Sequence, residues 1–293
     1  MIEVSACVIC NGPVRKVRKA LVAPFLATRI WNRRPFCVNL TACDACGFLF
    51  YNPRLDDDDL RRLYSGYRLP EYQEARRASE PWYTPRFNED LASPALYKRR
   101  RAALAPLLRE HLKGHTIRRV LDHGGDRGDL VAGLLDGAEA FVYDISGIPA
   151  AAGVTAVADP AACRPDLIIN SNVLEHVGFP LDLVRSILQS AGPGLVFLEV
   201  PVEQPSGLSR IVRRIAQAGI MSLAHPSLAP SILRPASLSM MHEHINYFTE
   251  HALTTLFRAA GGCVSASGTY TVDASPNRAE FAWCLGTAAG TNA

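Results

Sequence analysis

The feature that most limits the fold is an alternation, from Ile117 onward, of short apolar runs with stretches of helical periodicity. The helical stretches are residues 128–135 and 181–190, and the apolar runs are Val120-Leu121, Phe141–Tyr143, Leu167–Ile169 and Leu195–Leu198. This alternation is typical of βαβ units around a parallel sheet, with helices on both faces. Apolar residues near Cys263 and Trp283 suit two closing strands. We therefore predict an α/β domain over residues 116–293.

Four of the eight cysteines form two Cys-x-x-Cys pairs, Cys7 with Cys10 and Cys43 with Cys46. Each such turn places two thiolates on one side of a tetrahedron, so two turns complete a closed site for structural zinc. Residues 1–55 are predicted to form this zinc-binding module, whose intervening chain must bring the two pairs together. A redox role for one pair is the alternative.

Residues 56–115 are predicted to be a helical linker that contacts substrate. The acidic run from Asp56 to Asp59 precedes arginines by one turn, which suits a helix over residues 56–67 with its acids at the positive end. These acids are expected to cap the helix and not to bind calcium. Residues 68–94 lack clean periodicity and are interpreted as a linker, and a second helix is expected from Leu96 to Leu112.

The charge and composition exclude several classes of protein. With 48% hydrophobic and 20% charged residues the chain should be globular, and its net charge of +3 is too small to favour nucleic acid as a partner. Residues 1–54 are locally basic, which indicates either a solvated face or an anionic, phosphate-bearing substrate. No apolar run of membrane-spanning length and no signal peptide is found, so we expect a cytoplasmic location. The oligomeric state is not indicated.

A glycine-rich segment follows the first predicted strand of the α/β domain. It contains Asp122, Gly124, Gly125 and Gly128, whose spacing permits a tight turn and a close approach of ligand to backbone. Asp144 ends the next strand, where a ribose diol needs an acceptor. Together they predict a nucleoside cofactor, with a purely structural turn as the alternative.

In these segments the chain resembles class I S-adenosylmethionine-dependent methyltransferases, from about residue 117 to the C-terminus. Residues 166–177 (DLIINSNVLEHV) are similar to the family's fourth-strand motif, and residues 197–201 (FLEVP) to its fifth strand. The resemblance implies a Rossmann-like fold and S-adenosylmethionine as cofactor. It further implies that the 122–128 loop holds the methionine end, Asp144 the ribose, Asp159 the adenine amine, and Asn170 and Asn172 the floor near the sulfonium.

Two departures from the family pattern affect the site. Asp126 stands where the family usually has a second glycine in the loop, which puts cofactor affinity or the path of the loop in question. Some quinone-pathway methyltransferases bind a metal through acids that precede a pair like Glu175-His176. Because Asn172 replaces one such acid here, no second metal is expected.

The segment Met241–Thr249 and residues 46–53 (CGFLFYNP) resemble a subgroup of bacterial sugar methyltransferases with an N-terminal four-cysteine zinc domain. His244 is the preferred base for removing the acceptor's proton, with His242 and Glu243 as further catalytic candidates, because an imidazole has a suitable pKa. The alternative is that these polar residues only anchor the loop. Thr249 is expected to cap a helix over Ala252 to Ala260. His176 is as consistent with a packed, hydrogen-bonded histidine as with a catalytic one.

The sequence thus predicts methyl transfer from S-adenosylmethionine to a sugar that is nucleotide-linked or part of a surface glycan. One alternative is a methyltransferase of another small molecule or natural product. A second is a zinc-module protein that binds RNA or a partner protein, with a cofactor pocket weakened by Asp126.

Overall fold

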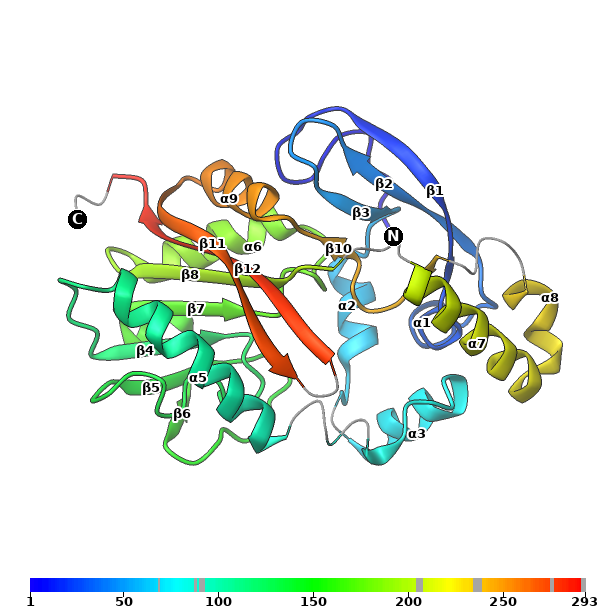
Figure 1. Ribbon diagram of the computed structural model, residues 1–293, viewed down its shortest axis with the longest axis horizontal. Coiled ribbons are helices and arrows are strands. Elements are labelled where there is room, and N and C mark those ends of the chain that lie inside the picture. Colours follow the sequence, from blue (N-terminus) through cyan, green and yellow to red (C-terminus); the bar gives the residue numbers. More distant parts are fainter. Residues whose placement is uncertain are drawn as a thin grey trace.

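The computed structural model describes residues 1–67, 69–86, 89, 93–203, 208–233, 239–274 and 277–290. It contains two β-sheets, which lie at opposite sides of Figure 1. The larger sheet is built from strands that lie between Arg119 and Ala288. The smaller one is built mainly from the first 52 residues and carries the paired cysteines at one end.

The larger sheet has seven strands in the order β11-β12-β8-β7-β4-β5-β6. Strands β4 to β8 are parallel, and β12 pairs antiparallel with both β8 and β11. The predicted α/β fold is confirmed, and so are its two closing strands. The bounds are β4 Arg119–His123, β5 Glu139–Tyr143, β6 Val154–Ala156, β7 Leu167–Ser171, β8 Leu195–Pro201, β11 Gly262–Ala274 and β12 Asn277–Ala288.

Helices cover both faces of this sheet. Helix α5 (Pro94–His111) buries Leu104 and Leu108 in a core with Phe197 and Trp283 on one face. Helices α6 (Pro180–Ala191) and α9 (Glu250–Ala259) pack on the other face. The Thr249 hydroxyl accepts a hydrogen bond from the Ala252 N–H at 3.1 Å, so the predicted cap of α9 is confirmed. A short 3₁₀ turn, η1 (Pro160–Cys163), follows β6.

The helix expected over residues 128–135 is wrong. The chain there forms successive turns, held by contacts such as Val131 N–H to Gly128 O at 3.1 Å. Gly128 and Gly133 have φ angles of +76° and +67°, in the left-handed region that an α-helix cannot contain. The apolar spacing was correct because Leu130, Val131 and Leu134 are buried, but a series of turns places them there.

The smaller sheet has the order β10-β3-β2-β1-β9. Its first three strands are antiparallel neighbours, β1 (Val14–Val22), β2 (Cys37–Cys43) and β3 (Leu49–Asn52), with α1 (Pro24–Trp31) between β1 and β2. Its two edges are β9 (Met240–Met241) and β10 (Asn246–Tyr247), from the chain after β8. The predicted boundaries at residues 55 and 115 stay a prediction, but the N-terminal sheet clearly includes two later strands.

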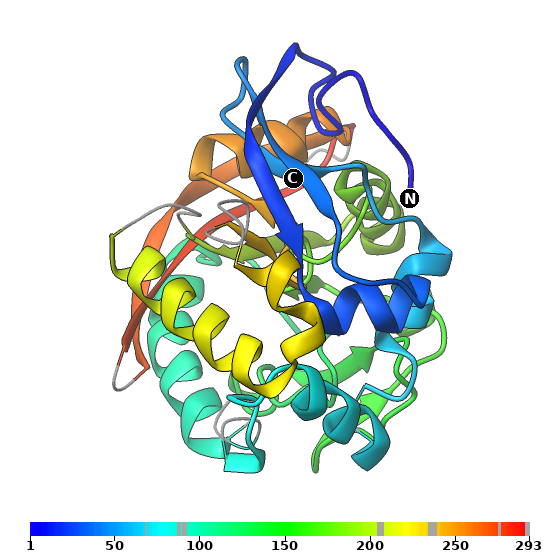
Figure 2. The same cartoon turned by 90° about the vertical axis from the view of Figure 1, so that its right-hand side faces the viewer.

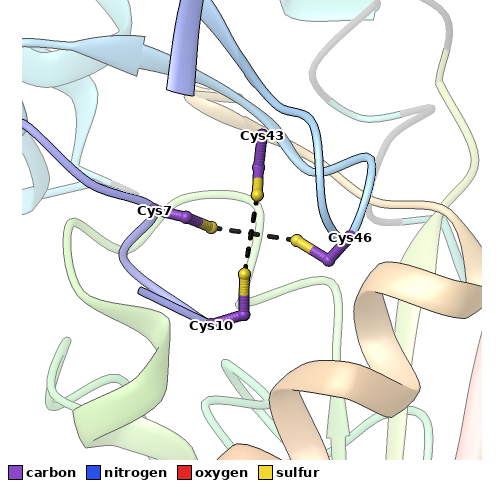
Figure 3. A group of neighbouring side chains, drawn as sticks. All are labelled: Cys7, Cys10, Cys43 and Cys46. Atoms are coloured by element: carbon purple, nitrogen blue, oxygen red, sulfur yellow. Dashed lines mark hydrogen bonds between the residues drawn. The ribbon is translucent and has the colours of Figure 1, made fainter. Parts of the chain in front are cut away.

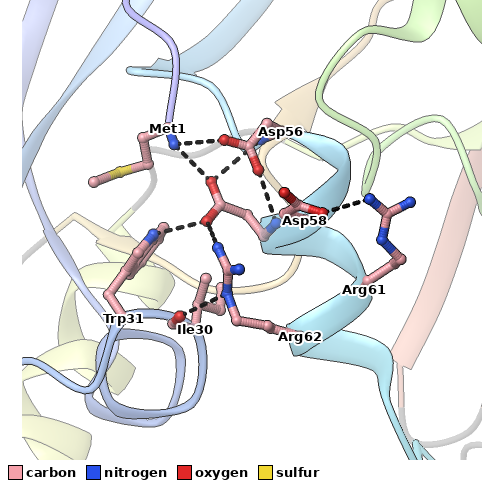
Figure 4. A network of polar contacts seen from close by, with 8 residues as sticks. Met1, Ile30, Trp31, Asp56, Asp58, Arg61 and Arg62 are labelled. Atoms are coloured by element: carbon pink, nitrogen blue, oxygen red, sulfur yellow. Dashed lines mark hydrogen bonds and ion pairs between the residues drawn. The ribbon is translucent and has the colours of Figure 1, made fainter.

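Helix α2 (Asp57–Tyr64) begins with the acidic run, as predicted (Figure 4). The Asp56 carboxylate accepts the Asp59 N–H at 2.8 Å, and the Asp59 carboxylate accepts the Asp56 N–H at 3.2 Å, which forms a capping box. Asp59 is buried and also contacts the N-terminal ammonium at 2.9 Å and the Trp31 indole N–H at 2.9 Å. The acids therefore fix the start of the helix and the N-terminus, in agreement with the capping interpretation.

The linker expected over residues 68–94 contains a helix, α3 (Pro70–Ser79), so that part of the interpretation is wrong. Its buried face consists of Tyr72 and Arg76, and Arg76 is held by carboxylates. A search for apolar periodicity misses such a helix because a buried arginine counts as polar. Residues 87, 88 and 90–92 lie outside the described part of the chain.

The connection between β8 and β9 forms α7 (Leu208–Ala224), the 3₁₀ turn η2 (Pro226–Leu228) and α8 (Ala229–Ile232). Figure 2 shows α7 beside α1, and Ala218, Met221 and Ile232 join the core of the smaller sheet. Among the helices in the described ranges, none is both long and apolar enough to cross a membrane.

Candidate functional site

The two cysteine pairs meet at one end of the smaller sheet (Figure 3). The Cys7 and Cys46 sulfurs are 3.8 Å apart, and those of Cys10 and Cys43 are 3.5 Å apart. A Zn–S bond of ~2.3 Å puts two corners of a tetrahedron about 3.8 Å apart, so the sulfurs already stand at the spacing of a zinc site. The hydrogen bond with Cys46 and the backbone N–H groups of Ile9 and Cys10 lower the pKa of Cys7 to about 5, which favours the thiolate.

The cysteine cluster is part of a larger core. Phe48 and Phe50 pack beside it, and this apolar cluster continues into Phe248, Leu253 and Leu256 at the start of and along α9. The residues present fit zinc in their number, chemistry and spacing. Zinc bound here would hold the N-terminal turns against the larger domain.

The glycine loop follows β4 and packs closely against neighbouring side chains of the protein itself. A side chain at Gly124 would meet Val173 at 2.8 Å, and one at Gly125 would lie 2.0 Å from the Asp122 carboxyl carbon. A side chain at Gly128 would meet Val154 at 2.8 Å. Asp126, the departure from the family pattern, has φ +57°, a conformation that aspartate tolerates better than most residues. The loop therefore keeps a left-handed residue at this position without glycine.

Unpaired polar atoms gather at the carboxyl ends of β4 and β7. Among the described residues, both Asp122 carboxylate oxygens and the Oδ1 atoms of Asn170 and Asn172 are buried without a hydrogen-bond partner. Burial raises the pKa of Asp122 to about 7, with further contributions from the Asp144 and Glu199 charges and in spite of Arg100. Buried polar groups usually have hydrogen-bond partners. The unpaired atoms beside the glycine loop therefore fit a polar cofactor that would supply those partners.

Asp144 directly follows β5, as predicted, and Asp159 lies three residues after the end of β6. The two Asp144 carboxylate oxygens accept the N–H groups of Asp126 and Ser146, both at 2.8 Å, so Asp144 also shapes the glycine loop. Asp159 is exposed and caps η1 by accepting the Ala161 N–H at 3.0 Å. Their contacts with ribose and adenine stay predictions.

The Asn170 amide donates to the His123 carbonyl at 2.8 Å, which fixes the end of β7 against β4. Beside it, Ser171 donates to Glu199 at 2.8 Å, and the guanidinium of Arg100 from α5 pairs with the same carboxylate. Tyr270 also donates to Glu199. The sequence did not single out this network because its members lie on four separate elements, α5, β7, β8 and β11, and share no local pattern.

The segment 242–244 divides between two environments. The His242 ring lies 3.1 Å from Glu80, and Glu243 accepts from the Tyr72 hydroxyl at 3.1 Å and pairs with Arg76. These two side chains are therefore tied to α3 and the residue that follows it. Their predicted catalytic role stays a prediction, and their contacts suit anchoring of the loop.

His244 lies in a second cluster with Glu175, His176 and Glu203. Its Nδ1 atom is 3.2 Å from Glu203, and its ring meets that of His176 edge to face with centroids 4.7 Å apart. Ligand atoms of Glu175, His176 and His244 all lie within 4.8 Å of one another. The Glu175 carboxylate is buried without a hydrogen-bond partner in the described chain. Glu203, which the sequence did not single out, is the new member.

The two histidines of this cluster are in opposite charge states. Burial, with the His244 charge, lowers the pKa of His176 to about 3, so its ring is neutral. Burial would also lower the pKa of His244, but the hydrogen bond and charge of Glu203, with the Glu175 charge, raise it to about 9. Burial raises the pKa of Glu175 to about 7. Titratable groups with separated pKa values are typical of sites of proton transfer.

Comparison with known protein families gives a match that covers more than half of the chain. Residues 92–262 match the family described as "Methyltransferase domain". No curated protein matches the sequence.

Two solved structures are similar in fold at low identity. The 1,6-didemethyltoxoflavin N1-methyltransferase of Burkholderia thailandensis, with 1,6-didemethyltoxoflavin and S-adenosylhomocysteine bound, is 17% identical with a TM-score of 0.48, over 85% of this chain and 96% of that one. The magnesium protoporphyrin IX methyltransferase of Synechocystis PCC 6803, with S-adenosylhomocysteine bound, is 13% identical with a TM-score of 0.45, over 78% and 99%. These likenesses assign no acceptor to this chain.

Zinc analysis tests the cysteine cluster. We expect elemental analysis to find one zinc ion per chain, lost when all four cysteines are changed to serine, because only the thiolates supply ligands. The exposed Cys37 changed to serine is the matched control and should retain zinc. A metal-free preparation that melts at the same temperature as the zinc-loaded one would contradict a structural zinc site.

Asp122→Asn tests the buried carboxylate. Its raised pKa means that the fold favours the protonated form, so this group's contribution to stability is full below pH ~4 and is lost as pH rises to ~7. Without ligand, the variant should match the wild type near pH 4 and exceed it in melting temperature at pH 8. A shift of this size corresponds to at most about 4 kcal/mol. Equal stability differences at both pH values would contradict the assignment.

Proposed function

Because the chain belongs to the methyltransferase domain family, we propose that it moves a methyl group from S-adenosylmethionine to a sugar acceptor, with His244 removing the acceptor's proton. Its fold is the class I methyltransferase fold expected from the sequence. The single observation that carries the proposal is the arrangement of both candidate subsites at the carboxyl ends of the parallel strands. The orphaned Asp122 lies at the end of β4, and the His244 cluster lies beyond β7 and β8.

When bound, S-adenosylmethionine supplies a methyl group on a positively charged sulfur. In the proposed reaction the acceptor atom forms a bond to this carbon, the sulfur keeps the electron pair of the broken bond, and the acceptor's proton passes to His244. Asp122 would face the cofactor's ammonium group, and the glycine loop would admit the cofactor close to its backbone. Holding acceptor and methyl donor in line would provide much of the rate acceleration.

A sugar acceptor is supported by the hydrogen-bonding character of the His244 cluster. Its members offer two imidazoles and two carboxylates in a small space, which suits an acceptor with several hydroxyl groups. A phosphate on the acceptor is part of the proposal because Lys16 and Lys19 are exposed on β1. The resemblance of the sequence to sugar methyltransferases with an N-terminal zinc domain also supports a sugar acceptor.

An acceptor screen tests the proposal directly. Purified protein and S-adenosylmethionine would be incubated with nucleotide sugars, free sugars and surface glycans, and products would be measured by mass. We expect a gain of one methyl group on a sugar only when the cofactor is present, and Asp122→Asn should weaken cofactor binding in calorimetry. Methylation of non-sugar compounds alone would contradict the acceptor class, and a lack of cofactor binding would contradict the function.

The ionisation of His244 leads to a pH prediction. With a pKa of about 9, only about one ring in a hundred is deprotonated at pH 7 in the free protein. A base must be deprotonated, so kcat/KM should rise with pH and level off near pH 9. Glu203→Gln removes the charge that raises this pKa, so the levelling should move to lower pH. His244→Ala should reduce turnover by about 10²- to 10⁴-fold.

Calorimetric cofactor affinity and melting temperature are measured on the same variants. Cofactor affinity and melting temperature should change little in His244→Ala if the histidine acts on the acceptor and not on the cofactor. His244→Asn separates catalysis from anchoring, because an amide can restore a hydrogen bond but cannot accept the proton. A stable and fully active His244→Ala chain would exclude both roles.

A further inference from the structure

Arg54 is the largest fully buried side chain of the protein's described part, and it lies just after β3, at the end of the zinc-binding module. Its guanidinium donates to five oxygen atoms. Nε donates to Gly178 O at 2.9 Å, and Nη1 donates to Tyr51 O at 2.9 Å and Ile245 O at 3.4 Å. Nη2 donates to Val177 O at 3.1 Å and to the Asn246 side-chain oxygen.

Four of these five acceptors belong to two of the three segments that carry the His244 cluster. Gly178 and Val177 directly follow Glu175 and His176, and Ile245 and Asn246 directly follow His244. The fifth acceptor, Tyr51, lies on β3 itself. One side chain thus joins the N-terminal sheet to both halves of the proposed site.

The two segments are also bonded to each other in a way that Arg54 completes. The Glu175 carbonyl accepts the N–H groups of Ile245 at 2.8 Å and Asn246 at 3.1 Å. The Asn246 amide donates to Leu174 O at 2.7 Å and Val177 O at 2.8 Å, while its oxygen faces Arg54. Arg54 therefore fixes the orientation of the Asn246 amide, which in turn holds the chain on either side of Glu175.

The backbone around Arg54 is held as firmly as its side chain. Its N–H and C=O pair with Ile2 at 2.7 and 2.8 Å. The next residue, Leu55, approaches Gly178 so closely that a side chain at Gly178 would lie 1.9 Å from the Leu55 carbonyl oxygen. The guanidinium also lies over the Phe50 ring, 5.2 Å from its centre. The contact between the module and the site is thus a fixed, close-packed one.

Arg54 is a cation without a carboxylate partner among the residues the structure describes, since its acceptors are carbonyl and amide oxygens. A buried charge usually has a charged partner, so this one is maintained at a cost in stability. Burial lowers the pKa of the Arg54 guanidinium, and a negative charge on Cys7, in the cysteine cluster, opposes this shift. A zinc ion held by four thiolates carries a net charge of −2. The zinc-loaded cysteine cluster would therefore keep a negative charge that offsets the positive charge of Arg54.

We propose that Arg54 is a positioning residue through which the zinc-binding module sets the relative placement of His176 and His244. The inference rests on the proposed function, because it assigns a purpose to the geometry of the His244 cluster. The five donors of a planar guanidinium reach three chain segments at once, which a lysine ammonium cannot do. The module therefore contributes to the site as well as to the stability of the fold.

Arg54→Lys tests the proposal by histidine NMR, which needs no acceptor. The ring signals of His176 and His244, assigned with the His176→Gln and His244→Gln variants, should both shift, and the pH at which His244 titrates should change. Zinc content should stay at one per chain, and cofactor affinity should stay within about twofold. Once an acceptor is known, kcat should fall by about 10- to 100-fold, the usual effect of removing a group that orients a catalytic side chain.

Asn52→Ala is the matched control. Asn52 lies two residues before Arg54 and bridges to Val4 with contacts of 2.8 and 3.1 Å, so its loss weakens the same module without touching the site segments. It should lower the melting temperature and leave both histidine signals in place. If Arg54→Lys does not fold, Asn246→Ser is used in its place. It removes one of the five acceptors of Arg54, the Asn246 side-chain oxygen, and should shift the same two histidine signals.

The proposal is overturned if the histidine signals are unchanged in a folded Arg54→Lys chain, or if Asn52→Ala shifts them equally. Shifted signals together with failure of all chains, wild type included, to methylate any acceptor would support the positioning role and contradict the proposed function. The two failures are therefore distinguishable.

Discussion

The placement of the proposed site depends on one constraint, the pairing of residues 240–247 with both edges of the smaller sheet. β9 extends β1 at one edge and β10 extends β3 at the other, so the four residues from His242 to Ile245 must span the sheet between them. This crossing turns the first two side chains toward α3 and leaves His244 beside Glu175. The N-terminal sheet thus acts as the template for a segment that lies nearly 200 residues later in the chain.

Several buried charged side chains lie near the carboxyl ends of the parallel strands and beside α3. Arg100 with Glu199, and Arg76 with Glu80 and Glu243, are paired and hydrogen-bonded, whereas Asp122 and Glu175 have buried carboxylates without hydrogen-bond partners in the described chain. Unpaired buried carboxyl groups destabilise a fold unless they become protonated or meet a ligand. Their raised pKa values therefore mark two places where the binding of a polar molecule would offset a cost in stability.

Local patterns predicted much of this structure and non-local ones did not. Strands β4, β5, β7 and β8, the caps of α2 and α9, the glycine loop and the cysteine pairs follow from neighbouring residues, so they could be predicted. The helix expected over 128–135 failed because glycine conformations overrode apolar spacing, and α3 was missed because its buried face includes an arginine. β9 and β10 have two residues each, too few for any periodicity. The contacts that place Arg54 and Glu203 beside the proposed site are with residues more than 40 positions away in the sequence, so no local pattern indicates them.

The composition of the smaller sheet has a consequence for how the protein is made. A ribosome releases the cysteine pairs and β1 to β3 first, but the edges of their sheet are covered only after residues 240–247 emerge. Until then the nascent module exposes two open strand edges, which are prone to pair with other chains. Early capture of zinc would hold the cysteine end together during this interval, while the other end of the sheet waits until residue 247 has been made. Synthesis thus couples the maturation of the metal-binding end to the completion of the catalytic domain.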